Sequence, residues 1–154
     1  MSAFIVRFKQ LLKLSLSDIR IILIALILLP LTAFFLRIKG FKWTQSLLSR
    51  CLPIKILPHI PQTNQLVIAK SIAKMVSVAA NHGPYRANCL KKTLVSWWLL
   101  SRKGIQTELK IGVNKDEGNF NAHSWLELQG EVLNDTADVD ERFSVFQSCK
   151  SQKS

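Results

Sequence analysis

Apolar and polar residues change their spacing twice along this chain, and each pattern predicts a different kind of secondary structure. Residues 21–36, IILIALILLPLTAFFL, are apolar except for Thr32. Between residues 63 and 80 the apolar positions recur every three or four residues, which predicts a helix with one buried face. The expected core stripe of that helix is Ile68, Ile72, Met75, Val76 and Ala79. From residue 105 onward apolar and polar residues alternate, which is typical of strands.

The boundaries of these elements are marked by capping and turn residues. Thr63 or Asn64 can cap the helix that ends at the NHGP sequence of residues 81–84. A second helix is predicted from Cys89, capped by Asn88 and ended by Gly104. Its expected inner residues are Leu90, Leu94, Trp97 and Trp98. The strands AHSWLEL and EVLND then form a hairpin around Gln129 and Gly130. Helices followed by antiparallel strands predict an α+β fold.

The apolar run of residues 21–36 permits three interpretations. It holds 16 residues, whereas a transmembrane helix needs about 20 and at least about 17. Arg20 and Arg37 stand at its two ends, and Pro30 predicts a kink within it. The run can be a helix that lies on or in the membrane surface, a helix buried in the protein, or a spanning helix. The pattern alone does not choose among them.

Proline residues divide the chain into regions. Residues 41–52 read as one short helix, and Pro53, Pro58 and Pro61 then form a connector in which no helix can continue. We therefore expect an N-terminal region of apolar helix and connector at residues 1–62 and a core at residues 63–146. Residues 147–154 lack apolar periodicity and are expected to be a frayed tail.

Composition narrows the class of protein. The 154 residues suffice for one domain, and 21 Lys and Arg against 10 Asp and Glu give a net charge of +11. Such a charge suits nucleic acid, anionic lipid or an acidic peptide, but no nucleic-acid-binding motif accompanies it. The three cysteines, Cys51, Cys89 and Cys149, are odd in number and widely spaced. We therefore expect free thiols in a reducing cytoplasm, with no disulfide framework, no metal site and no cofactor.

Three residues of the predicted core can form a catalytic triad. Cys89 begins a helix, and both a helix N-terminus and a neighbouring imidazolium favour the thiolate, which is the nucleophilic form. His123 and Asp135 lie on the two strands of the hairpin. A three-residue loop would set them directly opposite, whereas a two-residue loop would leave them one step diagonal. In the second case they would face apart unless a bulge or a strand end intervenes.

Other assignments remain open at this stage. His82 is a second candidate for the base, although its loop offers no carboxylate partner, and His59, between prolines, is a third. Cys89 can instead be a packing residue and His123 a structural one. Backbone N–H groups at Cys89 and its neighbours are the expected donors to an oxyanion.

Specific stretches of the core resemble a known family. CLKKTLVSWWLLSRKGIQTELKIGV, NKDEGNFNAHSWLELQGEVLND and ADVDERFSVF are similar to the transglutaminase-like cysteine peptidases of lasso-peptide maturation, over roughly residues 60–146. The resemblance implies a transglutaminase/papain-like fold, with Cys89 as nucleophile, His123 as base and Asp135 as its orienting acid. Thr93 and Ser124 stand where the family pattern has alanine, and neither is a triad residue.

The resemblance also implies partners. Members of the family remove the leader from a ribosomally made precursor peptide, after which an ATP-dependent cyclase closes a macrolactam. Some carry a winged-helix leader-binding domain at the front, and residues 1–60 do not read as one. We therefore expect a separate leader-binding protein. The free thiols indicate a cytoplasmic enzyme, and the basic flanks of the apolar run allow its association with the inner face of the membrane. The alternatives are an acyltransferase or transglutaminase with the same triad, and a non-catalytic basic adaptor at the membrane surface.

Overall fold

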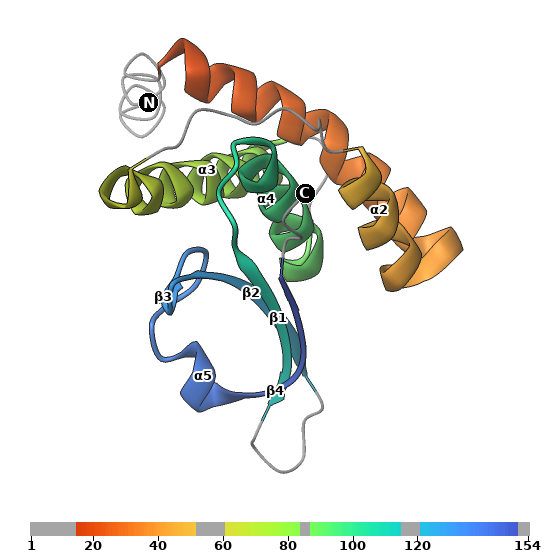
Figure 1. The fold of residues 1–154 in the computed structure, drawn as a ribbon. Coiled ribbons are helices and arrows are strands. Elements are labelled where there is room, and N and C mark those ends of the chain that lie inside the picture. Colours follow the sequence, from red (N-terminus) through yellow and green to blue (C-terminus); the bar gives the residue numbers. More distant parts are fainter. Residues whose placement is uncertain (1–14, 52–60, 84–86, 115–120, 151–154) are drawn as a thin grey trace, which may run out of the picture.

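The computed structural model describes residues 15–51, 61–83, 87–114 and 121–150, in which a layer of helices covers a four-stranded antiparallel sheet (Figure 1). The chain order confirms the predicted α+β fold. The helical layer comprises α2 (Leu16–Arg50), α3 (Gln62–His82) and α4 (Cys89–Arg102). The remaining elements are β1 (Glu108–Asn114), β2 (Ala122–Leu128), β3 (Glu131–Val132), α5 (Val139–Arg142) and β4 (Phe143–Lys150).

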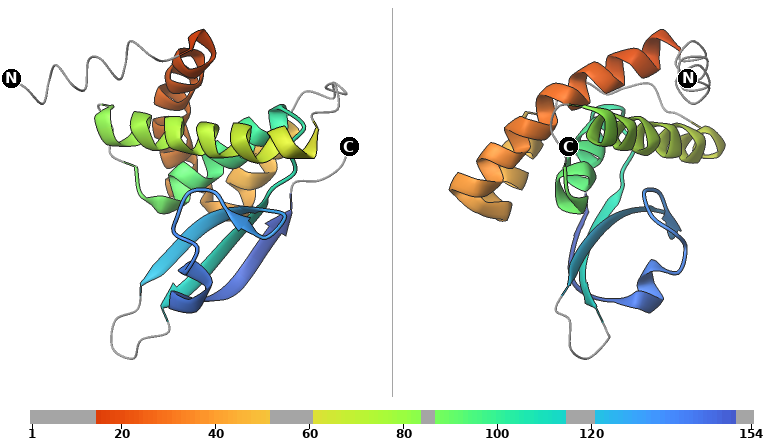
Figure 2. Two further views of the ribbon diagram at one scale, coloured as in Figure 1. Left: turned by 90° about the vertical axis from the view of Figure 1, so that its left-hand side faces the viewer. Right: turned by 180° about the vertical axis from the view of Figure 1, so that it is seen from behind.

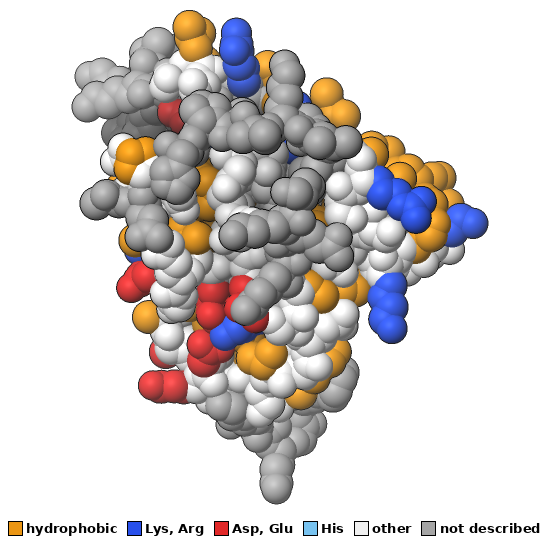
Figure 3. Space-filling view, viewed as in Figure 1, with side chains coloured by type: hydrophobic (Ala, Val, Ile, Leu, Met, Phe, Trp, Pro, Cys, Tyr) orange, Lys and Arg blue, Asp and Glu red, His pale blue; other side chains and the backbone are white. Residues whose placement is uncertain are grey.

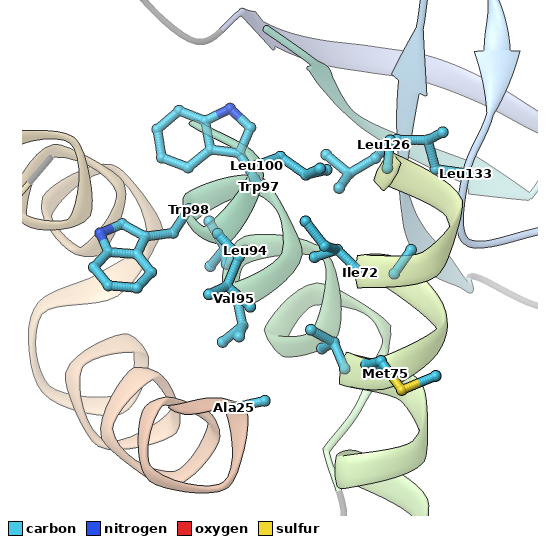
Figure 4. Close-up of a cluster of buried hydrophobic side chains, with 14 of the residues drawn as sticks. Ala25, Ile72, Met75, Leu94, Val95, Trp97, Trp98, Leu100, Leu126 and Leu133 are labelled. Carbon is cyan, nitrogen blue, oxygen red and sulfur yellow. The ribbon is translucent and has the colours of Figure 1, made fainter. Parts of the chain in front are cut away.

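Helix α4 lies at the centre of the molecule, between the other helices and the sheet (Figure 4). No residue from Thr93 to Leu100 is more than 7% exposed, so the buried surface extends beyond the predicted inner face. A helix that is apolar on nearly all sides is stable only inside a core. Its predicted ends are confirmed. The Asn88 side chain accepts a hydrogen bond from the Lys91 N–H (3.3 Å), and Gly104 adopts a left-handed φ of 72°.

Helix α3 carries the predicted core stripe, with Ile72, Met75, Val76 and Ala79 buried and Ile68 partly buried. The predicted cap is wrong. The helix begins at Gln62 after Pro61, so neither Thr63 nor Asn64 occupies the cap position, and no side chain caps it. At the other end of α3, the space at position 83 is too small for any side chain, so only glycine fits there. A Cβ there would lie 2.5 Å from the Ala79 carbonyl oxygen and 2.5 Å from Leu26 of α2.

Helix α2 continues through Pro30 with helical backbone angles and breaks instead at Gly40, whose φ is 78°. The segment after this break turns back beside the first (Figure 2), and the rings of Phe35 and Trp43 meet across the bend at 5.5 Å. The short helix predicted after residue 40 is therefore present. The helix is interrupted at Gly40 and not at Pro30, because glycine reaches φ > 0 without steric cost.

The packing of α2 shows how the predicted N-terminal region contacts the predicted core region. Ile21, Ala25, Leu29 and Leu48 belong to the same hydrophobic core as α3 and α4. Figure 4 shows Ala25 among these side chains. The described part of the N-terminal region therefore packs together with the predicted core region. By length and composition α2 is long and apolar enough to cross a membrane, and 22% of its most apolar window is buried in the protein.

The sheet has the strand order β3-β2-β1-β4. In β1, Gly112 pairs with His123 of β2, and a Cβ at Gly112 would lie 3.0 Å from the Trp125 ring and from Phe143. The predicted frayed tail is wrong for residues 147–150. They extend β4 because they find ladder partners in β1, and Cys149 packs against the main core. Residues 151–154 lie outside the described residues.

The two faces of the sheet are covered differently. Leu109, Ile111, Leu126 and Leu128 join the helical core, whereas Trp125 forms a second cluster with Val139 and Phe143. Val139 belongs to α5, which lies beside the sheet and away from α3 and α4 (Figure 1). Because side chains alternate along a strand, His123 shares the face of Trp125.

Candidate functional site

The β2–β3 hairpin decides where His123 and Asp135 stand. Glu127 pairs with Val132 and Leu128 with Glu131, so the loop consists of Gln129 and Gly130 alone. Both loop residues have positive φ, 54° and 86°, as a two-residue type I′ turn requires. This is the two-residue alternative, whose register leaves His123 one step from Asp135. The two residues nevertheless meet, because β3 ends at Val132 and the chain leaves the ladder before Asp135.

The His123 imidazole is held on three sides. Its Nε2 is hydrogen-bonded to Oδ2 of Asp135. Its ring stacks on Phe143 at a centroid distance of 5.0 Å and lies nearly parallel to Trp125 at 6.2 Å. The side chains of His123 and Asp135 are 25% and 17% exposed. Because Nε2 contacts Asp135, Nδ1 is the ring nitrogen through which His123 could exchange a proton with a reacting group.

Asp135 is held in turn by several donors. Its Oδ1 accepts hydrogen bonds from the Thr136 N–H (2.7 Å) and from Nη2 of Arg142 (3.0 Å). Burial by itself raises the pKa of Asp135. The hydrogen bonds from the Thr136 N–H, His123 and Arg142, together with the charge of His123, outweigh it and lower the pKa below the usual value of 3.8. The carboxylate therefore stays ionised at neutral pH and can stabilise an imidazolium.

Cys89 and His123 line one cleft of about 340 Å³. Cys89 is the first residue of α4 and is half-buried. The walls come from α3, α4, β2 and the segment after β3. The lining residues are Lys70, Ala73, Lys74, Ser77, Cys89, Lys92, Ser96, His123, Ser124, Leu133 and Asn134. The structure thus places the predicted nucleophile and the predicted base in the same cleft, with Asp135 behind the base.

The other candidates lie elsewhere. His82 is exposed at the end of α3 and is not among the residues that line the cleft. His59 falls outside the described residues. Cys51 is exposed at the end of α2, and Cys149 lies in β4. All three cysteines are free thiols. Across residues 15–51, 61–83, 87–114 and 121–150, no group of three His, Cys, Asp or Glu side chains is arranged to hold a metal ion.

A buried polar network that the sequence analysis did not predict joins α4 to β2. Thr93 Oγ1 donates to the Ser124 carbonyl (3.1 Å) and accepts from Nδ2 of Asn134 (3.0 Å). The Asn134 Oδ1 accepts from the Leu126 N–H (2.8 Å), in place of a strand partner beyond the end of β3. The two departures from the family pattern, Thr93 and Ser124, thus contact each other. The network fixes the helix of Cys89 against the strand of His123.

A second support lies beneath the His123 ring. Trp125 is fully buried, and its Nε1 donates to Oε1 of Glu127 (2.9 Å). The other oxygen of Glu127 pairs with Lys110 Nζ at 2.8 Å. Burial alone lowers the pKa of Lys110, but the hydrogen bond and charge of Glu127 raise it above 10.5. The indole, the carboxylate and the ammonium are therefore mutually satisfied, which keeps the floor of the site rigid.

Arg142 was also missed by the sequence analysis. It bonds Asp135, and its Nε pairs with Asp138 at 3.1 Å. No sequence spacing indicates this role, because the single turn of α5 brings Arg142 back to Asp135. Thr93 did leave a signal, since it is a polar residue within the apolar face of a buried helix.

Comparisons with known proteins give one family and one relative of this chain. The sequence matches the transglutaminase-like superfamily over residues 28–148, a segment that contains Cys89, His123 and Asp135. It is 29% identical over 80 residues to the microcin J25-processing protein McjB of Escherichia coli. That alignment covers 52% of this chain and 37% of McjB, so the chain spans well under two thirds of its relative's length. No solved structure gives a significant match.

Proposed function

This chain belongs to the transglutaminase-like superfamily, and on that basis we propose that it is a cysteine peptidase that removes the leader from a ribosomally synthesised, lasso-type precursor peptide. One observation carries the proposal. A histidine bonded to an ionised carboxylate shares a cleft with a cysteine at a helix N-terminus. The similarity to a microcin-processing protein supports the class of substrate.

The residues divide the chemistry among them. The Cys89 thiolate attacks the scissile carbonyl carbon, and the C–N bond breaks as His123 gives its proton to the leaving amine. A water then attacks the thioester while His123 takes its proton, and the thiol is regenerated. Asp135 fixes the ring orientation and stabilises the imidazolium.

The N-terminus of α4 can stabilise the oxyanion. The Asn88 side chain accepts a hydrogen bond from the Lys91 N–H, and the Asn88 backbone carbonyl accepts one from the Lys92 N–H. The other N–H groups of the first turn are those of Cys89 and Leu90. The helix dipole adds to the positive potential that these two groups present to an anion. We assign these two groups as the donors to the oxyanion of both tetrahedral intermediates.

The proposed partners follow from the disorder of a leader peptide. A disordered segment loses conformational entropy when it adopts an extended pose over Cys89. Docking the leader on a separate winged-helix protein would make its delivery effectively intramolecular. An ATP-dependent macrolactam cyclase would then consume the released peptide. All three cysteines are free thiols, which is consistent with the reducing cytoplasm in which we place this enzyme and its proposed partners.

The test is cleavage of a synthetic lasso-type precursor by the full chain, with and without a leader-binding protein, and with product masses measured. We expect a leader fragment with a free carboxylate and a core with a free amino terminus. The partner should raise the rate at low precursor concentration, mainly by lowering the apparent KM. A leader joined to an added amine would instead indicate acyl transfer. No product with either acceptor would overturn the proposed function.

A further inference from the structure

The outer face of α2, which we define as its exposed side between Arg20 and Arg37, is entirely apolar. The exposed positions on it are Leu23, Ile24, Ile27, Pro30, Leu31 and Phe34. Ile27 is 69% and Phe34 57% exposed. Figure 3 shows hydrophobic side chains along the upper right edge of the molecule, where α2 runs in Figure 1. A contiguous exposed apolar patch of this kind marks an interaction site.

The opposite side of the same helix is committed to the protein. Ile21, Ala25, Leu29 and Thr32 are at most 9% exposed, and they pack against the other helices. A spanning helix would have to place this side in lipid as well, and so would have to leave the core. The fold therefore favours a helix that lies parallel to a surface with only its outer face embedded.

The charges on α2 indicate which surface it meets. Arg20, Arg37, Lys39 and Lys42 are all exposed, and the first two bracket the apolar face. Asp18 is the sole acidic residue of α2, and it accepts a hydrogen bond from the Ser15 N–H in the capping box. Arginine and lysine stems can lie along an apolar surface while their charged ends reach lipid phosphates. We propose that the outer face of α2 seats this protein on an anionic lipid bilayer.

The test uses the full chain and vesicles of phosphatidylcholine, with or without phosphatidylglycerol, at low ionic strength. Wild type should co-float with the anionic vesicles. Ile27→Gln with Phe34→Gln should weaken partitioning by about tenfold or more, because it removes two embedded side chains. Arg20→Gln with Arg37→Gln should reduce the preference for anionic over neutral vesicles.

Matched controls separate this surface from general exposure. Val67 of α3 is 69% exposed and Phe146 of β4 is 61% exposed, so Val67→Gln with Phe146→Gln removes comparable apolar area elsewhere. This variant should partition like wild type. The inference is overturned if wild type does not bind anionic vesicles, or if the control loses as much binding. It is also overturned if wild type is a dimer that only the Ile27 and Phe34 changes dissociate, since a second copy would then cover the face.

A second observation, independent of α2, is that the charged side chains that line the cleft are all positive. Lys70, Lys74 and Lys92 line it, and among the described residues that line it there is no carboxylate. Lys70 and Lys74 are one turn apart on α3, and Lys92 stands on α4, one turn beyond Cys89. Their positive charges therefore reach the space in front of the thiol from two walls.

Little within the described residues neutralises these lysines. Lys70 meets Glu131 at 3.5 Å, but the two side chains are 50% and 61% exposed, so water and salt screen the pair. Lys92 donates to a neutral group, the Asn81 side chain (3.1 Å). Lys74 makes no hydrogen bond or ion pair with the described residues. If the chain is the proposed peptidase, we infer that this cleft selects a substrate with an acidic side chain close to the scissile bond.

Alkylation tests this charge without requiring peptidase activity. Iodoacetate and iodoacetamide attack the same thiol, but only iodoacetate is anionic. The ratio of their rates should be higher at Cys89 than at exposed Cys51. Lys74→Gln with Lys92→Gln should lower that ratio at Cys89 by about threefold or more, since the cations concentrate anions there. About 1 M salt, where the Debye length is about 3 Å, should reduce it similarly.

Lys103, exposed at the end of α4, provides the matched control. Lys103→Gln should leave the ratio at Cys89 unchanged. Equal ratios at Cys89 and Cys51, or equal effects of the cleft and control variants, would overturn the inferred subsite. Because alkylation is scored without a peptide, failure of the subsite is distinguishable from failure of the proposed peptidase function.

Discussion

Cys89→Ala is expected to abolish cleavage of a lasso-type precursor, and His123→Ala to slow it by about 10²- to 10⁴-fold. In the proposed mechanism, alanine at position 89 removes the atom that forms the thioester. Alanine at position 123 removes both the proton acceptor and the donor to the leaving amine. Initial rates from product masses measure both losses, and circular dichroism establishes that the variants are folded.

His82→Ala is the matched control for the base. His82 is exposed and does not line the cleft, so its loss should leave the rate within about twofold of wild type. Asp135→Asn should cost less than Cys89→Ala, because an amide can still contact the ring although it cannot stabilise the imidazolium. An inactive His82→Ala beside a normal His123→Ala would disprove the assignment of the base.

Trp125→Ala is expected to lower the free energy of unfolding by about 3–5 kcal/mol, the usual cost of truncating a buried aromatic side chain. Trp125 is fully buried, and its removal also deprives Glu127 of a hydrogen bond beside Lys110. Denaturant titration measures the loss. Because total stability is typically about 5–15 kcal/mol, Trp125→Phe provides a milder variant that should remain folded and still be measurably weakened.

The control for this loss is Trp43→Ala. Trp43 is 43% exposed and contacts Phe35 at the bend of α2, so its truncation should cost about 1 kcal/mol or less. If the two tryptophans cost the same, the second core cluster does not support the site as described.

The predicted elements that the structure confirms all depend on local patterns. The α3 stripe, the Asn88 cap and the Gly104 end of α4 are each set by residues within a few positions of one another. The cap predicted for α3 is a local pattern that failed, whereas the failure at the C-terminal end depends on a distant partner. Residues 147–150 have no periodicity of their own, yet they form β4 because β1 offers an open edge. Pro30 was expected to kink α2, but the break falls at Gly40, where the chain folds back.

The candidate site likewise combines features that local sequence sets with features that tertiary contacts set. The sequence by itself determined the α+β order, the start of a helix at Cys89, and the hairpin that brings His123 close to Asp135, because short-range periodicity, caps and turn residues specify them. Only the tertiary structure decided that β3 stops at Val132, so that Asp135 reaches the ring from a diagonal register. It also decided that Asn134, Thr93 and Arg142 support the elements that carry the proposed triad, and that α2 buries one face and exposes the other. Each of these outcomes depends on side-chain contacts or on the path of the chain beyond a strand end, which local patterning does not encode.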